Sequence, residues 1–297
     1  MKLDGITTFV AVVEAGSISA AARRLHLSKS VVSERLAELE RSLGAPLLHR
    51  TTRALSVTED GATFLERAIR IVREVEEATS TLAERRGTLA GPLRLSAPVT
   101  FGRLHLGPAL YPFLLRHPAI ELTLDLDDRR IDAAAEGYDG VVRHGPLVAS
   151  RLIAWRLASS RRVLVAAPDY LARHGTPATA AALEAHRGIF YTYRGIDDWR
   201  FRSTEGSVVV RARFGLRVNN GDMMRDAAIA GLGIALLPKF IAGAAIRAGT
   251  LTAIDIGVGV DEEFIMIAHP DGRRPSAKLR ALAAHLRATF GDPPYWE

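Results

Sequence analysis

Apolar residues near the start of the chain recur at the spacing of amphipathic helices. A first helix is predicted from positions three or four residues apart, namely Leu3, Ile6, Phe9, Val10 and Val13. Gly16 ends this helix, because glycine adopts the left-handed conformation of a helix C-cap without strain. Ser17 then caps a second helix over about residues 19–25, with Ala21, Ala22 and Leu25 facing inward. The pattern therefore predicts two short helices in close contact.

A third helix follows after a turn at His26 and Leu27. Ser28 is a good N-cap, and Gly44 closes the helix. One apolar stripe runs along it, formed by Val31, Val32, Leu36, Leu39 and Leu43. Residues 46–57 then carry two apolar clusters around a basic tip, which predicts a small β-hairpin or wing.

A long helix is predicted to begin at Thr58 and to run from Glu59 to about Arg86. Its apolar positions alternate spacings of three and four, namely Leu65, Ala68, Val72, Val75, Thr79 and Leu82. That spacing is typical of the seam of a two-stranded coiled coil, so we expect dimerisation through this helix. The alternative is a helix that packs on its own domain.

Beyond a boundary marked by Gly87, Gly91 and Pro92, strand-like segments alternate with helical ones. The strands are expected at 93–97, 121–126, 161–168 and 264–268, and the helices near 103–116 and 276–289. This alternation predicts βαβ units, a parallel sheet and a second unit of the same type that begins near residue 161. The last helix is expected to pack back on the first unit.

Composition agrees with a folded chain of several units. The 297 residues exceed the usual size of one domain, and 48% of them are hydrophobic. The net charge is +6, and residues 23–53 hold seven basic residues against three acidic ones. A local net charge of +4 suits a polyanionic partner. There is no cysteine, and no apolar run reaches the length of a signal-peptide core or a membrane span, so a cytoplasmic protein without a membrane partner is expected.

Donor side chains gather near the start of the third helix and on the wing. A helix of this width fits the major groove of DNA, where its first residues reach the base edges. The candidates on the helix are Ser28, Lys29, Ser30, Ser33 and Arg35, and those on the wing are Arg50, Thr51, Thr52 and Arg53. An ordinary solvated basic face is the alternative.

The order of these features resembles the LysR-type transcriptional regulators. The resemblance is carried by AGSISAA (15–21), LERSLG (39–44), LLHRTTR (47–53) and VTEDG (57–61). It continues through GPLRLSAPVTFGRLHL (91–106), RVLVAAPDYLARHGTP (162–177) and NNGDMMRDAAIAGLGIALLP (219–238). The resemblance implies that Ser28 through Arg35 read DNA and that Arg50 and Arg53 lie near phosphates.

The resemblance also implies a domain organisation. A winged helix-turn-helix domain spans 1–58, a linker and dimerisation helix spans 59–87, and an effector-binding domain spans 88–297. The effector-binding domain has two Rossmann-like α/β lobes of the type 2 periplasmic-binding-protein kind. The first lobe is expected at about 88–161 and 268–297, and the second at about 162–267. A homodimer or homotetramer is implied.

Glu34 departs from the family pattern. Such proteins commonly carry a basic or amide residue after the serine at this point, and Lys29 stands where a glutamine is frequent. A carboxylate near phosphates weakens DNA binding unless it pairs with Arg35, Arg41 or a cytosine amino group.

Several residues of the C-terminal part are candidates for binding a small organic anion. Thr100 and Asn220 each precede a helix, where a hydroxyl or amide and free backbone N–H groups can hold an anion. Arg143 ends a strand and can clamp a carboxylate. The full candidate set is Thr100, Phe101, Arg143, Tyr191, Asn219 and Asn220. The alternatives are plain helix capping, a surface salt bridge for Arg143 and a core position for Tyr191.

Motifs of catalysis are missing. The chain has no Walker A loop, no GxSxG, no HExxH and no paired metal-binding histidines, so no catalytic residue, metal site or cofactor is expected. The sequence favours a regulator that binds double-stranded DNA under the control of a small effector. A solute-binding protein or transport subunit is the alternative, because the C-terminal two thirds would suit one.

Overall fold

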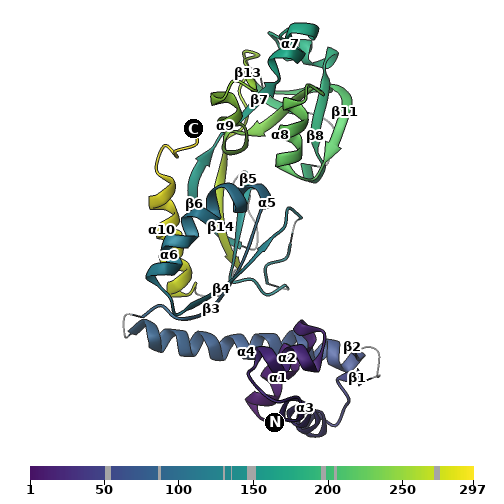
Figure 1. The fold of residues 1–297 in the computed structure, drawn as a ribbon, viewed down its shortest axis with the longest axis vertical. Coiled ribbons are helices and arrows are strands. Elements are labelled where there is room, and N and C mark those ends of the chain that lie inside the picture. Colours follow the sequence, from purple (N-terminus) through teal and green to yellow (C-terminus); the bar gives the residue numbers. More distant parts are fainter. Residues whose placement is uncertain are drawn as a thin grey trace. The chain divides into compact units, whose positions relative to one another are not determined.

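The computed structural model divides the chain into two compact units, Met1–Thr88 and Leu89–Glu297 (Figure 1). We call them the N-terminal unit and the C-terminal unit. The structure describes residues 1–50, 55–85, 88–129, 131–134, 136–145, 152–194, 199–203, 206–270 and 275–297. No single helix in these ranges is long and apolar enough to cross a membrane, and one bent pair, the first two helices, passes that test only when taken together.

The N-terminal unit consists of helices and one small hairpin. Its elements are α1 (Leu3–Ala15), α2 (Ile18–Arg24), α3 (Lys29–Leu43), β1 (Leu48–Arg50), β2 (Leu55–Val57) and α4 (Glu59–Arg85). The predicted caps are confirmed: Ser17 Oγ accepts a hydrogen bond from the Ala20 N–H, and Ser28 Oγ accepts one from the Val31 N–H. Gly16 and Gly44 end α1 and α3 with φ values of 66° and 71°.

Helix α4 belongs in part to the core of its own unit. Ala68 is fully buried, and the Phe64 ring lies 5.8 Å from the Phe9 ring of α1. Val72 packs against the same core, whereas Val75 is 40% exposed. The predicted dimer seam therefore has two parts, because its first turns pack against the core of the N-terminal unit and are not available to a partner. The alternative of packing on the own domain holds for this first half, and the dimer contact stays a prediction for the second half.

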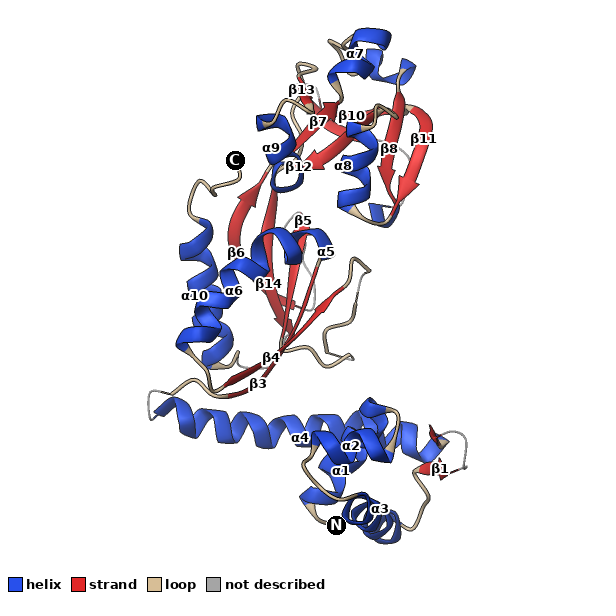
Figure 2. Ribbon diagram, viewed as in Figure 1, coloured by secondary structure: helices blue, strands red, loops and turns tan. Residues whose placement is uncertain are grey.

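The first lobe of the C-terminal unit is built on a five-stranded sheet in the order β4-β3-β5-β14-β6. The strands are β3 (Gly91–Ala97), β4 (Ile120–Leu126), β5 (Gly140–Gly145), β6 (Leu152–Ser160) and β14 (Glu263–Pro270). Its helical segments are α5 (Val99–Phe101), the π-helical turn η1 (Gly102–Leu106), α6 (Gly107–Arg116) and α10 (Ala277–Phe290). Helix α10 packs on α6 and β6, as expected for the returning last helix (Figure 2).

The second lobe has a five-stranded sheet in the order β11-β8-β12-β7-β13. The strands are β7 (Arg162–Ala166), β8 (Arg187–Tyr191), β11 (Arg213–Val218), β12 (Ile234–Pro238) and β13 (Thr252–Ile254). Its helices are α7 (Pro168–His174), α8 (Gly221–Ile229) and α9 (Lys239–Arg247), with 3-10 turns η2 (Ala181–Ala185) and η3 (Thr192–Arg194). A separate hairpin is formed by β9 (Trp199–Ser203) and β10 (Gly206–Val210).

Two expectations for this unit are wrong. The sheets are mixed rather than parallel: β3 runs parallel to β4 and β5, but β14 is antiparallel to β5 and β6. The reason is the chain path, since β6 leads out of the first lobe and β14 returns from the second in the opposite direction. Because β14 begins at Glu263 and belongs to the first sheet, the second lobe ends before residue 263, not near 267.

Candidate functional site

Helix α3 has one face that is not used by the core. Val32, Leu36 and Leu39 are buried, whereas Ser30 and Glu34, one turn apart, are exposed. Lys29 is exposed beside them, and Ser33 is half-buried. The Ser28 and Ser30 hydroxyl oxygens lie 2.8 Å apart, so the cap also orders the first turn. This face presents short polar side chains at the start of the helix, as major-groove reading requires.

Arg35 lies to the side of that face. Its Nη2 atom is 3.0 Å from the Asp4 carboxylate of α1, which holds the guanidinium against the unit itself. Arg41 Nε donates to the Ala37 carbonyl oxygen. The two arginines suggested as partners of Glu34 are therefore engaged with other groups. Within the described part of the chain, Glu34 has no hydrogen bond or ion pair. The carboxylate points outward with Ser30.

The wing is anchored to both neighbouring helices. Glu40 Oε1 of α3 accepts hydrogen bonds from the Leu47 and Leu48 N–H groups, at 2.9 and 3.2 Å. Thr58 donates to the Pro46 carbonyl and accepts from the Gly61 N–H at the start of α4. In the hairpin, Arg50 pairs with Leu55 by register. The side chain of Arg50 and residues Thr51, Thr52 and Arg53 lie outside the described residues, so their DNA contacts stay predictions.

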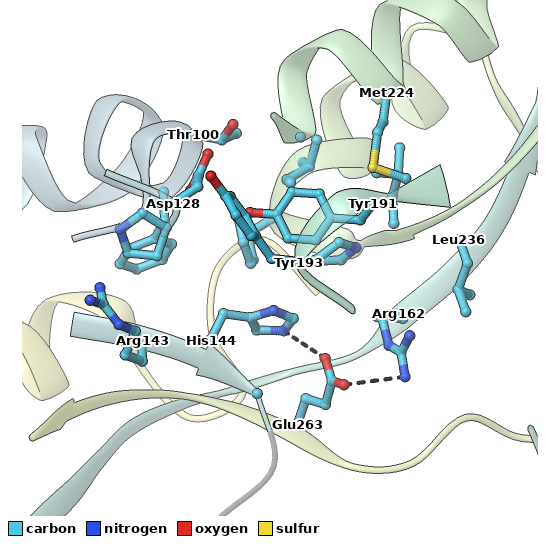
Figure 3. A pocket seen from close by; sticks show the side chains of 18 of the residues that line it. Thr100, Asp128, Arg143, His144, Arg162, Tyr191, Tyr193, Met224, Leu236 and Glu263 are labelled. Carbon is cyan, nitrogen blue, oxygen red and sulfur yellow. Dashed lines mark ion pairs between the residues drawn. The ribbon is translucent and has the colours of Figure 1, made fainter. Parts of the chain in front are cut away.

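A cavity of about 770 Å³ lies between the two lobes of the C-terminal unit. Aromatic side chains from both lobes line it, namely Phe101, Phe190, Tyr191, Tyr193, Trp199 and Phe240. Such a volume and lining are typical of small-molecule sites. Of the residues predicted from the sequence, Thr100, Phe101, Arg143 and Tyr191 are brought together here (Figure 3).

A buried carboxylate joins the two lobes beneath this cavity. Glu263, the first residue of β14, is 3% exposed. Its Oε1 lies 3.2 Å from Arg162 Nη2 of the second lobe. Its Oε2 lies 3.1 Å from His144 Nε2 of the first lobe, although that contact lacks hydrogen-bond geometry (Figure 3). The ion pair therefore connects the segments at which the chain crosses between lobes.

Arg143 offers an unused donor at the cavity. Its Nη1 donates to the Val142 carbonyl, while the Nη2 atom is buried and has no hydrogen-bond partner in the described part of the chain. Burial lowers the pKa of Arg143, and the negative charges of Asp127 and Asp128 oppose that shift. Buried polar atoms are nearly always paired, so an unpaired one at a cavity wall indicates a place for a ligand acceptor.

The start of α5 is already occupied by the protein. The Val99 N–H donates to Asp128 Oδ1 at 3.0 Å, and burial raises the pKa of Asp128. Thr100 Oγ1 donates across the cleft to Asp222 Oδ2 at 3.1 Å. The expected anion site of free amides at Thr100 is therefore filled by a carboxylate of the chain itself, although Thr100 lines the cavity.

The two asparagines lie outside the cavity lining. Asn220 caps α8 by accepting from the Met223 N–H, which is the capping alternative considered above. Asn219 is exposed. Sequence reasoning missed Glu263, Arg162 and Phe240, because no local motif marks them and only the crossing of the chain between lobes brings them together. The described residues contain no group of three or more histidine, aspartate or glutamate residues placed to hold a metal ion.

Comparison with known proteins covers nearly the whole chain. Residues 3–62 match the bacterial regulatory helix-turn-helix model of the lysR family, and residues 86–291 match the LysR substrate binding domain. The regulator DmlR of Escherichia coli K12 is 31% identical over 292 residues, covering 98% of this chain and 95% of DmlR. The regulator CrgA of Neisseria meningitidis is 35% identical over 250 residues, covering 84% of this chain and 83% of CrgA.

Solved structures of LysR-type regulators match the chain over nearly its whole length. The full-length Vibrio cholerae virulence activator AphB shares 26% identity and a TM-score of 0.60, covering 97% of this chain and 99% of AphB. The structure of CrgA shares 30% identity and a TM-score of 0.56, covering 96% of each chain. A solute-binding protein or transport subunit, the alternative raised by the sequence, does not account for the match over residues 3–62.

Proposed function

The chain belongs to the LysR family of transcriptional regulators, and from this premise we propose that a small organic anion in the interlobe cavity modulates its binding to operator DNA. The observation that carries the proposal is the buried Arg143 Nη2, for which the described residues supply no hydrogen-bond partner, at a cavity with aromatic walls. A carboxylate supplies an acceptor for this nitrogen, and a flat apolar body can pack against the aromatic wall that includes Phe101, Tyr191 and Phe240.

DNA reading is assigned to the outward face of α3 and to the wing. Base edges are assigned to Ser30 and Ser33, with Lys29 beside them; Lys29 and Ser30 are exposed and Ser33 is half-buried. Arg35, paired with Asp4, is assigned to phosphate contact at the flank rather than to a base. Arg50, Thr52 and Arg53 are proposed to hold the flanking backbone. Dimerisation is assigned to the second half of α4, beyond Val72.

The coupling between ligand and DNA is proposed to pass through the lobe crossing. A ligand that contacts both lobes stabilises one angle between them, and the linked subunits of an oligomer then present their recognition helices at one spacing. The ion pair of Glu263 with Arg162 joins the two lobes at this crossing and supports the proposal. The ligand acts only by binding one lobe arrangement more tightly than another.

A thermal-shift screen of the full chain tests the ligand proposal. Sodium salts of aromatic and aliphatic monocarboxylates are compared with the corresponding neutral amides. A carboxylate at 100 times its dissociation constant is expected to stabilise by about 2.7 kcal/mol, while its amide has little effect. Arg143→Gln should lose the response, and Arg247→Gln, a change at an exposed arginine of α9, should keep it. An equal thermal shift with carboxylate in both variants would show that Arg143 does not bind the ligand.

A further inference from the structure

The six residues that follow Gly291, the C-cap of α10, cross from the first lobe to the second. We call residues 292–297 the C-terminal tail. Helix α10 lies in the first lobe, yet the tail ends beside α9 of the second lobe (Figure 2). The approach is close: a side chain at Gly243 of α9 would place its Cβ 3.3 Å from the Trp296 carbonyl oxygen. Trp296 itself is 3% exposed. Pro294 and Trp296 are therefore packed against the unit, while the Tyr295 side chain is 57% exposed.

The last residue is bonded to the crossing point between the lobes. Glu297 Oε1 accepts a hydrogen bond of 2.9 Å from the N–H of Arg161, the residue between β6 and β7. Glu297 Oε2 lies 3.4 Å from the Lys239 Nζ of α9. The Lys239 N–H in turn donates to the Arg161 carbonyl oxygen at 2.8 Å. Glu297 thus contacts both the backbone at Arg161, where the chain passes from the first lobe to the second, and Lys239 at the start of α9. We call residues 160–162 the hinge.

Behind the cavity wall, the tail completes an aromatic cluster shared by both lobes. Phe101 of the first lobe and Phe240 of the second meet edge to face, with ring centroids 5.2 Å apart, and both line the cavity. Trp296 packs on Phe101 at 5.9 Å and on Phe240 at 6.5 Å. Edge-to-face pairs of this kind contribute beyond their buried area and fix ring orientation.

His105 connects this cluster to the tail by hydrogen bonds. Its Nε2 lies 2.9 Å from the Phe240 carbonyl oxygen, and its Nδ1 lies 2.7 Å from the Tyr295 hydroxyl. A carbonyl only accepts, so Nε2 carries the proton and the Tyr295 hydroxyl donates to Nδ1. One chain of hydrogen bonds therefore runs from the tail through the first lobe to the backbone of Phe240.

We propose that Tyr295, Trp296 and Glu297 are positioning residues of the effector cavity, which hold the facing pair Phe101 and Phe240 and fix the angle between the lobes. The proposal rests on the proposed function only in taking the cavity as the effector site. The contacts of Tyr295, Trp296 and Glu297 do not involve a ligand, so the experiment that tests them needs no ligand. A failure of the test would leave the regulator assignment standing.

Hydrogen–deuterium exchange of the full chain, followed by mass spectrometry, is the test. Tyr295→Phe removes one hydroxyl and keeps the ring. A second variant lacks residues 295–297. The matched control is Tyr111→Phe, a change at a tyrosine of α6 that is 64% exposed. The peptides to follow span 152–166, which includes Arg161, and 234–247, which includes Phe240.

Tyr295→Phe is expected to speed exchange at 234–247 about fivefold, the factor for losing one hydrogen bond of about 1 kcal/mol. The truncated chain should show a larger increase there and a new increase at 152–166, while peptides of β3, β4 and the N-terminal unit stay unchanged. Tyr111→Phe should leave all peptides unchanged. A role confined to general stability would raise exchange throughout the C-terminal unit in proportion. That result, or unchanged exchange at both hinge peptides in the two variants, would overturn the proposal.

Discussion

Removal of the Glu263 carboxylate is the sharpest test of how the two lobes are joined. Glu263 is buried between Arg162 and His144, whose side chains are only 10% and 11% exposed. Glu263→Ala takes away from the buried Arg162 guanidinium the carboxylate that lies 3.2 Å from it. Breaking a buried ion pair by deleting one partner costs about 3–5 kcal/mol, because the remaining charge stays desolvated.

The corresponding shift in melting temperature follows from the size of the unit. For a unit of this length, Leu89–Glu297, each kcal/mol moves the midpoint by about 2–4 °C. Glu263→Ala is therefore expected to lower the transition of the C-terminal unit by about 6–20 °C. Glu263→Gln keeps an acceptor for Arg162 and should lose less.

Differential scanning calorimetry of the full chain measures these shifts. The matched control is Glu262→Ala, since Glu262 is the exposed neighbour of Glu263 and its loss should cost no more than about 0.5 kcal/mol. The double variant Glu263→Leu with Arg162→Met removes both charges and should recover much of the stability. The reasoning is refuted if Glu263→Ala shifts the midpoint no further than Glu262→Ala.

Three further predictions concern pH, assembly and DNA sequence. Burial lowers the pKa of His105 and of His186 in the folded chain, so the unfolded chain binds more protons as pH falls through about 6.5. The urea midpoint of the C-terminal unit should therefore drop from pH 7 to pH 5. A midpoint that does not change with pH would contradict the burial of these rings. Val75→Asp, at an exposed position of α4, should convert dimers to monomers in light scattering without unfolding the N-terminal unit, whereas Val72→Asp should destabilise that unit. A dimer that survives Val75→Asp would place the dimer contact elsewhere. Glu34→Gln should move the base preference at one operator position from cytosine to adenine, because a carboxylate accepts from the cytosine amino group and an amide pairs with adenine. Selection from a randomised duplex library measures this change, which is worth about 1–3 kcal/mol. Unchanged base preferences would mean that Glu34 does not read a base.

Local features of the fold were predictable because short-range physics decides them. Ser17 and Ser28 cap helices in almost any context, and Gly16 and Gly44 end helices since only glycine adopts positive φ at little cost. The wing followed from its short apolar clusters. Strand directions did not follow, because the same alternating pattern arises whether a strand continues a lobe or returns from the other one.

The candidate site was predictable only where a strand end or helix start marked it. Arg143, near the end of β5, lines the cavity, and so does Thr100 near the start of α5. Glu263 and Arg162 carried no such mark, because they meet across about a hundred residues of chain that form the second lobe. Val72 shows another limit: a spacing of three and four residues suits a dimer seam and the core of the same unit equally well.

The central claim is that a carboxylate at Arg143 changes how this regulator binds its operator. Fluorescence anisotropy tests it most directly, with the full chain titrated into a duplex from its own upstream region and into a shuffled duplex, with and without each monocarboxylate. We expect tighter binding to the upstream duplex than to the shuffled one, and at least one carboxylate that changes this affinity for the wild type but not for Arg143→Gln. Equal binding to the two duplexes, or an equal carboxylate response in wild type and Arg143→Gln, would contradict it.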